Sequence, residues 1–449
     1  MKILHNLNTN DSIVIKNIFG AFSIKGISLL ISIFSLPLYI RFFNDDIVLG
    51  LWFTLLSILT WLLTFDFGIG NGLRNKLVKA IAKNDTSLVR TYISSSYMLL
   101  GIIVLGFILV LTPVIFLINW NLLLKVEENY ISSFTLLIVI FINFFTVIIQ
   151  FFLRLISFIL YALQKSAVNN LIALLTTVSQ LIFVLLYPAR NAEHNLIVLS
   201  FVHMICVILP LAVTTFVIFS KKLKFALPRM KYYDFKVGKE ILSLGGKFFW
   251  IQIMYLVLTG TNAFFIANIF SPDKVVEYTI YYRIFSLTGI VITLTLTPFW
   301  SLLTKAKEEN DWKWIQKYFR LFSLLSIVVF AINLTTVFIL QFLFNVWLGD
   351  VSIKVTYSYA ILFALFGFIF SIQSFVSIFA NGFNRIKTQL IVYTLGVLIK
   401  IIILYGFTTV IINWSYIVLV DLIIFIIYIF IEYGLTYKYI RKKITLIQK

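Results

Sequence analysis

Two basic residues, Arg154 and Lys400, stand inside long runs of apolar residues, where a charge is costly and usually functional. Counted from the nearest cations outside these runs, Lys165 and Lys387, they lie 11 and 13 residues deep. On a helix these separations correspond to about 16 and 20 Å. Arg binds phosphate oxygens with a planar fork and Lys acts as a point charge. We therefore expect the two residues to hold an anion between them.

Other interpretations of the same charges remain open. Lys400 can form an ion pair with Asp421, whose depth differs by only about 5 Å, and both roles can hold in different states. Arg154 can instead extend toward the inner interface. Asp66 and Asp421, the acidic residues that we place inside the runs, are candidates for ion coupling. For Asp66 the favoured alternative is a helix terminus with a satisfied carboxylate.

Polar side chains accompany these charges at helical spacing. One run carries them at steps of 3, 4, 4, 3 and 4 residues, which is one face of a helix: Asn143, Thr146, Gln150, Arg154, Ser157 and Tyr161. Two later runs repeat the pattern, with Gln252, Tyr255, Thr259 and Asn262, and with Arg283, Ser286, Thr293, Thr297 and Ser301. Such groups face either a wet cavity or neighbouring helices through hydrogen bonds. The substrate-binding candidates are Arg154, Lys400, Lys25, Asn143, Gln150, Gln252, Asn262 and Thr293.

The first apolar run adds one cation and one proline. Lys25 stands near its inner mouth, where extension to the interface is the default interpretation and phosphate capture the alternative. Pro37 lies inside the run, whereas Ala263 occupies the matching position of the second half. A proline within a helix removes a hydrogen bond and kinks it. We therefore expect Pro37 to form a hinge near the outer end.

The composition indicates which elements position these residues. Of the 449 residues, 61% are apolar and 12% charged, against about 25% charge in a soluble domain. A water-soluble fold cannot hide so much apolar surface, and continuous runs favour helices over barrel strands. The prediction is an all-α membrane protein with about 12 transmembrane helices. The runs are 20–43, 47–70, 91–118, 131–162, 168–188, 196–219, 248–270, 281–303, 321–348, 357–380, 389–412 and 414–437.

The distribution of charge predicts the orientation. With the N-terminus in the cytoplasm, 29 Lys and Arg face the cytoplasm, 6 face outside and 2 lie within runs. The acidic residues divide 8 to 8, with Asp66 and Asp421 inside runs. The net charge of +19 then attracts anionic lipids at the inner face, and no nucleic-acid partner is expected. The even number of runs places both termini in the cytoplasm.

The chain is predicted to consist of two related halves. The basic linker 221–247 separates an N-terminal six-helix lobe, 1–220, from a C-terminal lobe, 248–449, which ends in a basic cytoplasmic tail. We expect a parallel repeat, a plan known for alternating-access transporters, with chance similarity among apolar segments as the alternative. At an offset of 226, Gly20 matches Gly246, Lys79-Ala80 matches Lys305-Ala306, Asn84-Asp85 matches Asn310-Asp311 and Tyr92 matches Tyr318; at 220, Lys165 matches Arg385 and Gln180 matches Lys400.

The sequence offers no motif for bond-breaking chemistry. Gly245-Gly246-Lys247-Phe248 does not fit the P-loop pattern, and no nucleophile–base constellation stands out. The single Cys206 excludes a disulfide framework and a thiolate metal site, and the three His are scattered. We therefore expect transport without catalysis, without a cofactor and without a metal.

The N-terminal part contains several distinctive stretches: Lys25-Gly26, Pro37-Leu38-Tyr39, Leu49-Gly50-Leu51-Trp52, and Phe65-Asp66-Phe67-Gly68-Ile69-Gly70-Asn71-Gly72-Leu73-Arg74-Asn75 running on to Lys79-Ala80. They resemble those of bacterial polysaccharide repeat-unit flippases. The last stretch is the most specific and is similar to the O-antigen flippase branch of the multidrug/oligosaccharidyl-lipid/polysaccharide exporter superfamily. Relatives of that branch include lipid II flippases and the multidrug and toxic compound extruders (MATE). The sharp motif covers about residues 20–90, whereas span count and length agree over the whole chain.

The resemblance implies a V-shaped, MATE-like pair of pseudo-symmetric six-helix bundles around a cationic cavity. The implied substrate is an undecaprenyl-diphosphate-linked oligosaccharide, O-antigen or similar, moved from the cytoplasmic to the outer leaflet of the inner membrane. A proton or sodium gradient is the implied driving force. Members carry charged residues in the second, fourth and eleventh spans, where Asp66, Arg154 and Lys400 stand here. The polysaccharide polymerase and the chain-length regulator are the implied protein partners.

Two other functions compete with this interpretation. A multidrug/cation antiporter of the same fold is the alternative, although a cationic drug requires acidic cavity residues, for which Asp66 and Asp421 are the candidates. A membrane-embedded glycan polymerase or ligase needs a large outer loop with catalytic groups. The longest outer connection has about a dozen residues, which argues strongly against that third function.

Overall fold

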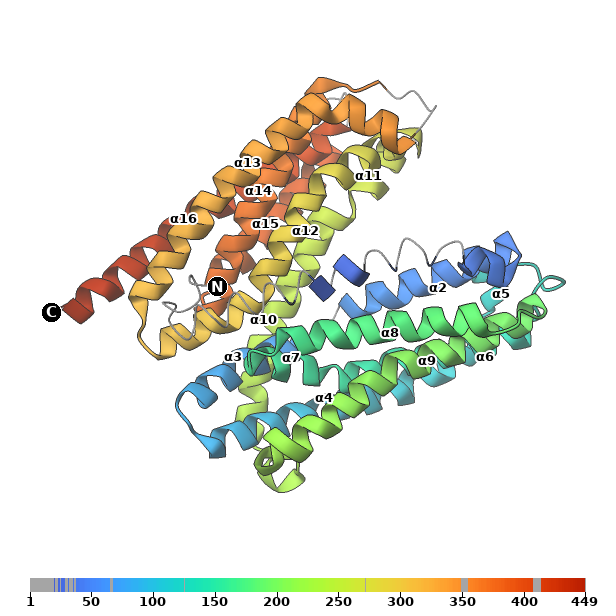
Figure 1. Ribbon diagram of the computed structural model, residues 1–449, viewed down its shortest axis with the longest axis horizontal. Coiled ribbons are helices and arrows are strands. Elements are labelled where there is room, and N and C mark those ends of the chain that lie inside the picture. The colour runs from blue at the N-terminus through green and yellow to red at the C-terminus, as the bar shows by residue number, and fades with distance from the viewer. Residues whose placement is uncertain are drawn as a thin grey trace. The chain divides into compact units, whose positions relative to one another are not determined.

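The computed structural model describes residues 20, 23, 24, 26–28, 31, 35, 38–64, 68–124, 126–270, 272–348, 354–406 and 413–448. Over these residues every regular element is a helix, as predicted (Figure 1). Helices satisfy their own backbone hydrogen bonds, which hydrocarbon requires. Ten of the described helices are long and apolar enough to cross a membrane. The chain is therefore a multi-pass membrane protein.

The helices follow the predicted apolar runs. The first run lies partly outside the described residues. The described residues of each later run lie on one helix or on two consecutive helices. In the first half these are α2 (Asp46–Thr64), α3 (Ile69–Ala82), α4 (Thr86–Leu117), α5 (Trp120–Leu124), α6 (Ser133–Leu153), α7 (Leu155–Ala162), α8 (Ser166–Leu186) and α9 (Ala192–Val217). In the second half they are α10 (Phe235–Gly260), α11 (Asn262–Ile269), α12 (Pro272–Glu308), α13 (Trp312–Leu348), α14 (Tyr357–Gly382), α15 (Lys387–Gly406) and α16 (Ser415–Gln448).

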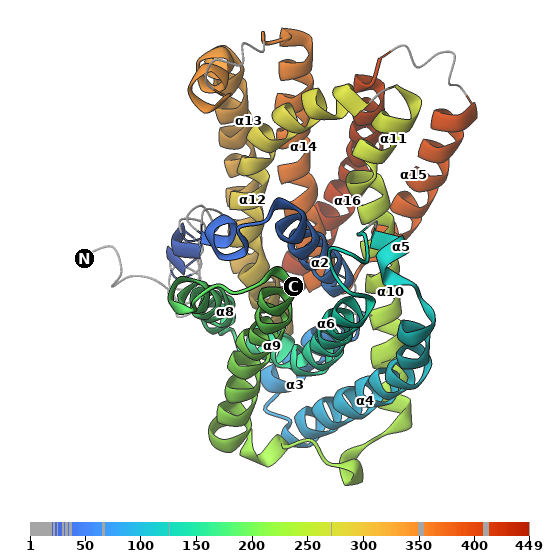
Figure 2. The same ribbon diagram turned by 90° about the vertical axis from the view of Figure 1, so that its right-hand side faces the viewer.

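The chain divides into two compact units, Met1–Gly246 and Lys247–Lys449. In the first unit α6 packs against α4 and α9, α3 packs against α4 and α7, and α8 packs against α9. In the second unit α14 is central, because it packs against α12, α13 and α16, while α15 packs against α16 (Figure 2). Each unit has a buried apolar core of its own, around Leu73 and Ile156 in the first and around Phe363 and Ile417 in the second.

The basic segment predicted as a linker, 221–247, is folded. It contains the end of η2 (Ile218–Lys222), then η3 (Lys224–Ala226) and η4 (Met230–Tyr232), and continues into α10. Both η3 and η4 pack against α4. The Ser94 hydroxyl accepts from the backbone N–H of Arg229 at 3.3 Å, and the Ser95 hydroxyl accepts from that of Asp234 at 3.1 Å. The buried serines of α4 thus fix this segment to the first unit.

The internal repeat reappears in the turns between helices. Asn84 and Asn310, which are 226 residues apart, both adopt left-handed backbone angles, with φ of 54° and 59°. Gln164 and Asn384, 220 residues apart, do the same, with φ of 58° and 59°. The residue that follows each of these four donates its backbone N–H to the carbonyl oxygen five residues earlier, as Asp85 does to Ala80 and Asp311 does to Ala306. Such turns terminate helices, and their agreement at these two offsets is consistent with the predicted repeat.

Candidate functional site

A fully buried ion pair occupies the second unit. Lys400 on α15 and Asp421 on α16 are both inaccessible to solvent, and Lys400 Nζ lies 2.9 Å from Asp421 Oδ1. The helices approach closely here, because a Cβ on Gly396 would lie 2.6 Å from a methyl carbon of Ile424. The ion pair considered for Lys400 from the sequence is therefore present. Neutralisation of each charge by the other permits both residues to lie at membrane depth.

A helix interruption completes the site around Lys400. The seventh predicted span is not continuous, because α10 ends at Gly260 and α11 begins at Asn262. Helix ends leave carbonyl groups without intrahelical donors, and Lys400 Nζ donates to Leu258 O at 2.5 Å. Lys400 also donates to Asn262 Oδ1 at 2.6 Å, while Asn262 Nδ2 donates to Asp421 Oδ2 at 2.8 Å. We call Lys400, Asp421 and Asn262 the buried triad. Broken helices that supply polar groups at membrane depth are typical of transporter sites.

Aromatic side chains surround the buried triad. Lys400 Nζ lies 5.7 Å from the ring centroid of Phe265, within the range of a cation–π contact. Tyr255 on α10 packs against Phe425, one helical turn beyond Asp421, with ring centroids 6.0 Å apart. This apolar wall excludes water, so the charges of the triad depend on one another and on Asn262.

A second polar network runs along α16 beyond the triad. Tyr428 OH accepts hydrogen bonds from Ser377 Oγ at 3.1 Å and from Gln389 Nε2 at 3.0 Å. Gln373 Nε2 donates to Tyr393 OH at 2.6 Å and to Ser377 Oγ at 3.0 Å. One further turn along α16 lies Glu432, which the sequence count assigned to the cytoplasmic side but which is buried, at 1% exposure.

In the first unit, Arg154 occupies a one-residue interruption between α6 and α7. The long fourth run is therefore divided at its cation. Arg154 is half-buried, and its Nη1 donates to Leu63 O in the last turn of α2 at 2.5 Å. A cation at a helix C-terminus compensates the carbonyl dipoles there. Among the described residues Arg154 has no acidic partner, and most of its five N–H donors remain available to an anion.

The glycine motif that carries the family resemblance positions α3 against α7, the helix that follows Arg154. Gly68 has a φ of 65°, and a Cβ there would lie 1.7 Å from the Gly245 carbonyl oxygen. Only glycine combines this backbone angle with such close contact. The following turns of α3 bury Arg74, whose guanidinium lies 4.7 Å from the ring centroid of Tyr161 on α7. The motif thus permits close packing, in addition to the local loosening of the helix expected from its glycines.

The other predicted binding residues lie in different surroundings. Asn143 is buried and donates to Val139 O at 2.8 Å and to Ser200 Oγ of α9 at 3.2 Å, a contact between helices. Gln150 is half-buried. Gln252 is partly buried, and its Oε1 has no hydrogen-bond partner among the described residues. Thr293 is exposed, and its hydroxyl donates to Gly289 O of its own helix at 2.8 Å.

Three predicted residues lie outside the described residues or have no described side chain. These are Lys25, the proposed hinge Pro37 and the ion-coupling candidate Asp66. Their roles remain predictions. Of the named candidates, the structure brings together Lys400, Asp421 and Asn262.

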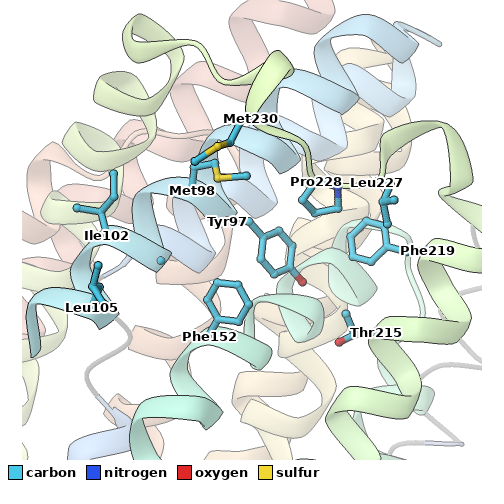
Figure 3. Close-up of a pocket in the computed structure, with 11 residues that line it drawn as sticks. Tyr97, Met98, Ile102, Leu105, Phe152, Thr215, Phe219, Leu227, Pro228 and Met230 are labelled. Carbon is cyan, nitrogen blue, oxygen red and sulfur yellow. The ribbon is translucent and has the colours of Figure 1, made fainter. Parts of the chain in front are cut away.

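An apolar cavity of about 560 Å³ lies in the first unit, within the size range of ligand pockets. Figure 3 shows that the Tyr97 hydroxyl points between Thr215 and Phe219. The lining contains no charged side chain, which suits a hydrocarbon chain and not a sugar or phosphate. It consists of Tyr97, Met98, Gly101, Ile102, Leu105, Phe152, Thr215, Phe219, Leu227, Pro228 and Met230.

Two functional candidates were missed from the sequence. Glu432 lies only six residues before Lys438 and is counted with the cytoplasmic acidic residues, although its position falls within the run 414–437. Steps of 4, 3 and 4 residues lead from Asp421 through Phe425 and Tyr428 to Glu432, which places all four on one face of α16. This spacing is visible in the sequence. Arg74 follows an apolar run and was interpreted as part of a basic loop, and only the fold reveals its burial.

Comparison with known proteins shows what the chain is similar to in sequence and in fold. No family model matches the sequence. A Salmonella typhimurium (strain LT2) protein named "Putative O-antigen transporter" is 25% identical over 362 residues, which cover 77% of this chain and 79% of that protein. The resemblance inferred from residues 20–90 is confirmed as a sequence similarity.

Solved structures agree over nearly the whole chain. An outward-facing multidrug resistance MATE family transporter of the MOP superfamily has a TM-score of 0.73, at 13% identity, and covers 97% of both chains. A MATE protein in the straight conformation gives a TM-score of 0.71 at 12% identity and covers 98% of both chains. A Vibrio cholerae MATE transporter in the bent form gives 0.69 at 13% identity, with 97% and 99% coverage. The expected MATE-like fold is confirmed.

Proposed function

We propose that the chain is a flippase that moves an undecaprenyl-diphosphate-linked oligosaccharide repeat unit from the cytoplasmic to the outer leaflet of the bacterial inner membrane. Transport proceeds by alternating access and is driven by an ion gradient. Both termini and the segment 221–247 are cytoplasmic, and the halves 1–220 and 248–449 act as the two lobes. The polymer is O-antigen or a similar surface polysaccharide.

The observation that carries this proposal is the state of Arg154. Its charge sits within a helix long enough to span the membrane, yet it bonds to a carbonyl group and to no described carboxylate. Among the described residues no opposite charge neutralises Arg154, and the fork of a guanidinium matches the oxygens of a diphosphate. A diphosphate and sugars cannot cross hydrocarbon unaided, because they would lose their water.

Two further features support a lipid-linked anionic substrate. The apolar cavity of the first unit has the chemistry that suits a hydrocarbon chain. Seven exposed cations, proposed to be cytoplasmic, attract anionic head groups and the substrate to that face: Lys221, Lys222, Lys224, Arg229, Lys231, Lys236 and Lys239. The O-antigen assignment itself is supported by the 25% identical Salmonella protein.

The decisive experiment measures the crossing of a lipid-linked oligosaccharide in vesicles that contain the purified protein. We expect the native protein and Arg190→Ala, a control at an exposed cation, to expose the saccharide at equal rates. Arg154→Ala abolishes transport, and Arg154→Lys retains part of it because a point charge remains. Failure of the native protein to move the lipid would contradict the function. Native rates in Arg154→Ala would contradict only the role of Arg154.

A multidrug/cation antiporter is the second candidate, since a structure with the same fold is described as a multidrug resistance transporter. A cationic drug requires an available carboxylate, whereas Asp421 is already paired with Lys400. Drug resistance on overexpression, together with normal surface polysaccharide on deletion, would favour this alternative. Loss of surface polysaccharide on deletion would favour the flippase.

A further inference from the structure

Glu432 is a buried carboxylate that the proposed transport of an anionic lipid does not use. It lies on α16, one helical turn beyond Tyr428, and is 1% exposed. Its Oε1 accepts a hydrogen bond from Thr436 Oγ1 at 3.2 Å. Its Oε2 is buried and has no hydrogen-bond partner among the described residues. A charged carboxylate at this depth is costly unless neighbouring groups compensate it.

Comparison with Asp421 on the same helix face shows what Glu432 lacks. Asp421 has a lysine at 2.9 Å and an amide donor at 2.8 Å, so it can be charged while buried. Glu432 forms no ion pair within the described part of the chain. Because neutralisation is the usual fate of an unpaired buried acid, the geometry favours a proton on Oε2.

The surroundings of Glu432 provide a connection to one surface and to the membrane interior. Thr388 on α15 is within reach of the carboxylate, and Arg385 in the α14–α15 turn is close enough to act on it electrostatically. Arg385 is half-buried and stacks on the Tyr439 ring, 4.7 Å from its centroid. The other titratable or charged groups near this end of the unit are Tyr393, Tyr428, Tyr439, Lys307 and Glu308.

Toward the membrane interior, a polar network begins at Tyr428, one helical turn from Glu432, and joins side chains of α14, α15 and α16. Its members are Gln389, Tyr428, Ser377, Gln373 and Tyr393. Tyr393 contacts Tyr255, with ring centroids 6.1 Å apart, and Tyr255 borders the buried triad. Hydroxyl and amide groups at these spacings form polar steps in an otherwise apolar bundle. Glu432 therefore stands where such a series of groups reaches the proposed cytoplasmic end.

We propose that Glu432 is a proton-binding site that holds a proton on Oε2 and releases it to the cytoplasmic side during the transport cycle. The O–H bond of the carboxyl group breaks, the proton passes to a water molecule, and the negative charge that remains on the carboxylate is met by Arg385. The coupling role rests on the proposed transport function, which would then use protons as its driving ion. Proton binding itself does not depend on the substrate.

The test of proton binding uses infrared difference spectroscopy of the purified full-length protein in lipid vesicles, titrated with pH. A protonated buried carboxyl gives a C=O band that shifts in deuterium oxide. We expect Glu432→Gln to remove one such band, Glu432→Asp to retain a shifted one, and Glu128→Gln, at an exposed carboxylate, to leave the spectrum unchanged. Identical titrations of the native protein and Glu432→Gln would overturn the proposal. A band that disappears at constant pH when sodium is added would assign the site to sodium instead.

The coupling role is tested separately with the lipid-linked oligosaccharide assay. The native rate should change by up to about tenfold per pH unit on the limb where the carboxyl group titrates, and Glu432→Gln should flatten this limb. If Glu432→Gln keeps the native pH profile, the coupling role is wrong. If the native protein moves no substrate while the infrared band is still lost in Glu432→Gln, the transport proposal fails and the proton site stands.

Discussion

The two halves of the chain share their turns but treat their membrane-embedded cations in opposite ways. In the first half Arg154 is half-buried and bonds to one carbonyl oxygen, Leu63 O. In the second half Lys400 is inaccessible and is held by Asp421, Asn262 and Leu258 O. Within the described part of the chain, one cation has no acidic partner, whereas the other is neutralised within its own unit.

This difference indicates that the embedded cations of the two halves have different roles. A neutralised pair costs less to keep within the membrane, and it joins α15 and α16 to the broken helix α10–α11. A cation without an acidic partner stabilises the fold little but binds anions strongly. The joint anion site of Arg154 and Lys400 stays a prediction, and it would require the release of Lys400 from Asp421.

The largest expected effect is that of Lys400→Met. The change leaves the Asp421 carboxylate buried without its cation, which costs about 3–5 kcal/mol of stability. The double variant with Asp421→Asn should recover most of that loss, because no charge is then stranded. Thermal unfolding of the four proteins in a double-mutant cycle measures the coupling. A loss below about 1 kcal/mol in Lys400→Met would show that Asp421 does not depend on Lys400.

Arg154→Ala should have a smaller effect on stability and a larger one on function. The variant loses one charge-assisted hydrogen bond to a helix C-terminus, worth about 1–2 kcal/mol, and strands no described carboxylate. Unfolding measurements should therefore show a modest loss while transport is abolished. A loss as great as that of Lys400→Met would mean that Arg154 is chiefly structural, and the contrast between the halves would disappear.

The sequence predicted the architecture better than the site, for physical reasons. Apolar runs long enough to span hydrocarbon permit almost no structure except helices, so the runs after the first lie on helices. Depth along the chain suggested the pairing of Lys400 with Asp421, because positions on facing helices follow from the rise per residue. The helical face from Gln252 to Asn262 was also visible as spacing.

The features that the sequence did not predict depend on contacts between helices. The break at Gly260-Thr261 has no proline to mark it, and it is stabilised by Lys400, which comes about 140 residues later in the chain. Glu432 resembles an interfacial acid because of the nearby Lys438, and Arg74 resembles a loop cation. Their burial is decided by neighbouring helices, which local pattern does not reveal.

The smallest expected effects concern the matched turns of the two halves, where equivalent substitutions should change stability equally. Asp85 Oδ1 accepts from the Leu88 N–H at 2.9 Å, and Asp311 Oδ1 accepts from the Trp314 N–H at 3.1 Å. Both aspartates cap the helix that follows, so Asp85→Ala and Asp311→Ala should each cost about 1 kcal/mol. Because the two turns belong to different units, their effects should add in the double variant. Unequal costs in unfolding measurements would show that the halves have diverged even where their backbones agree.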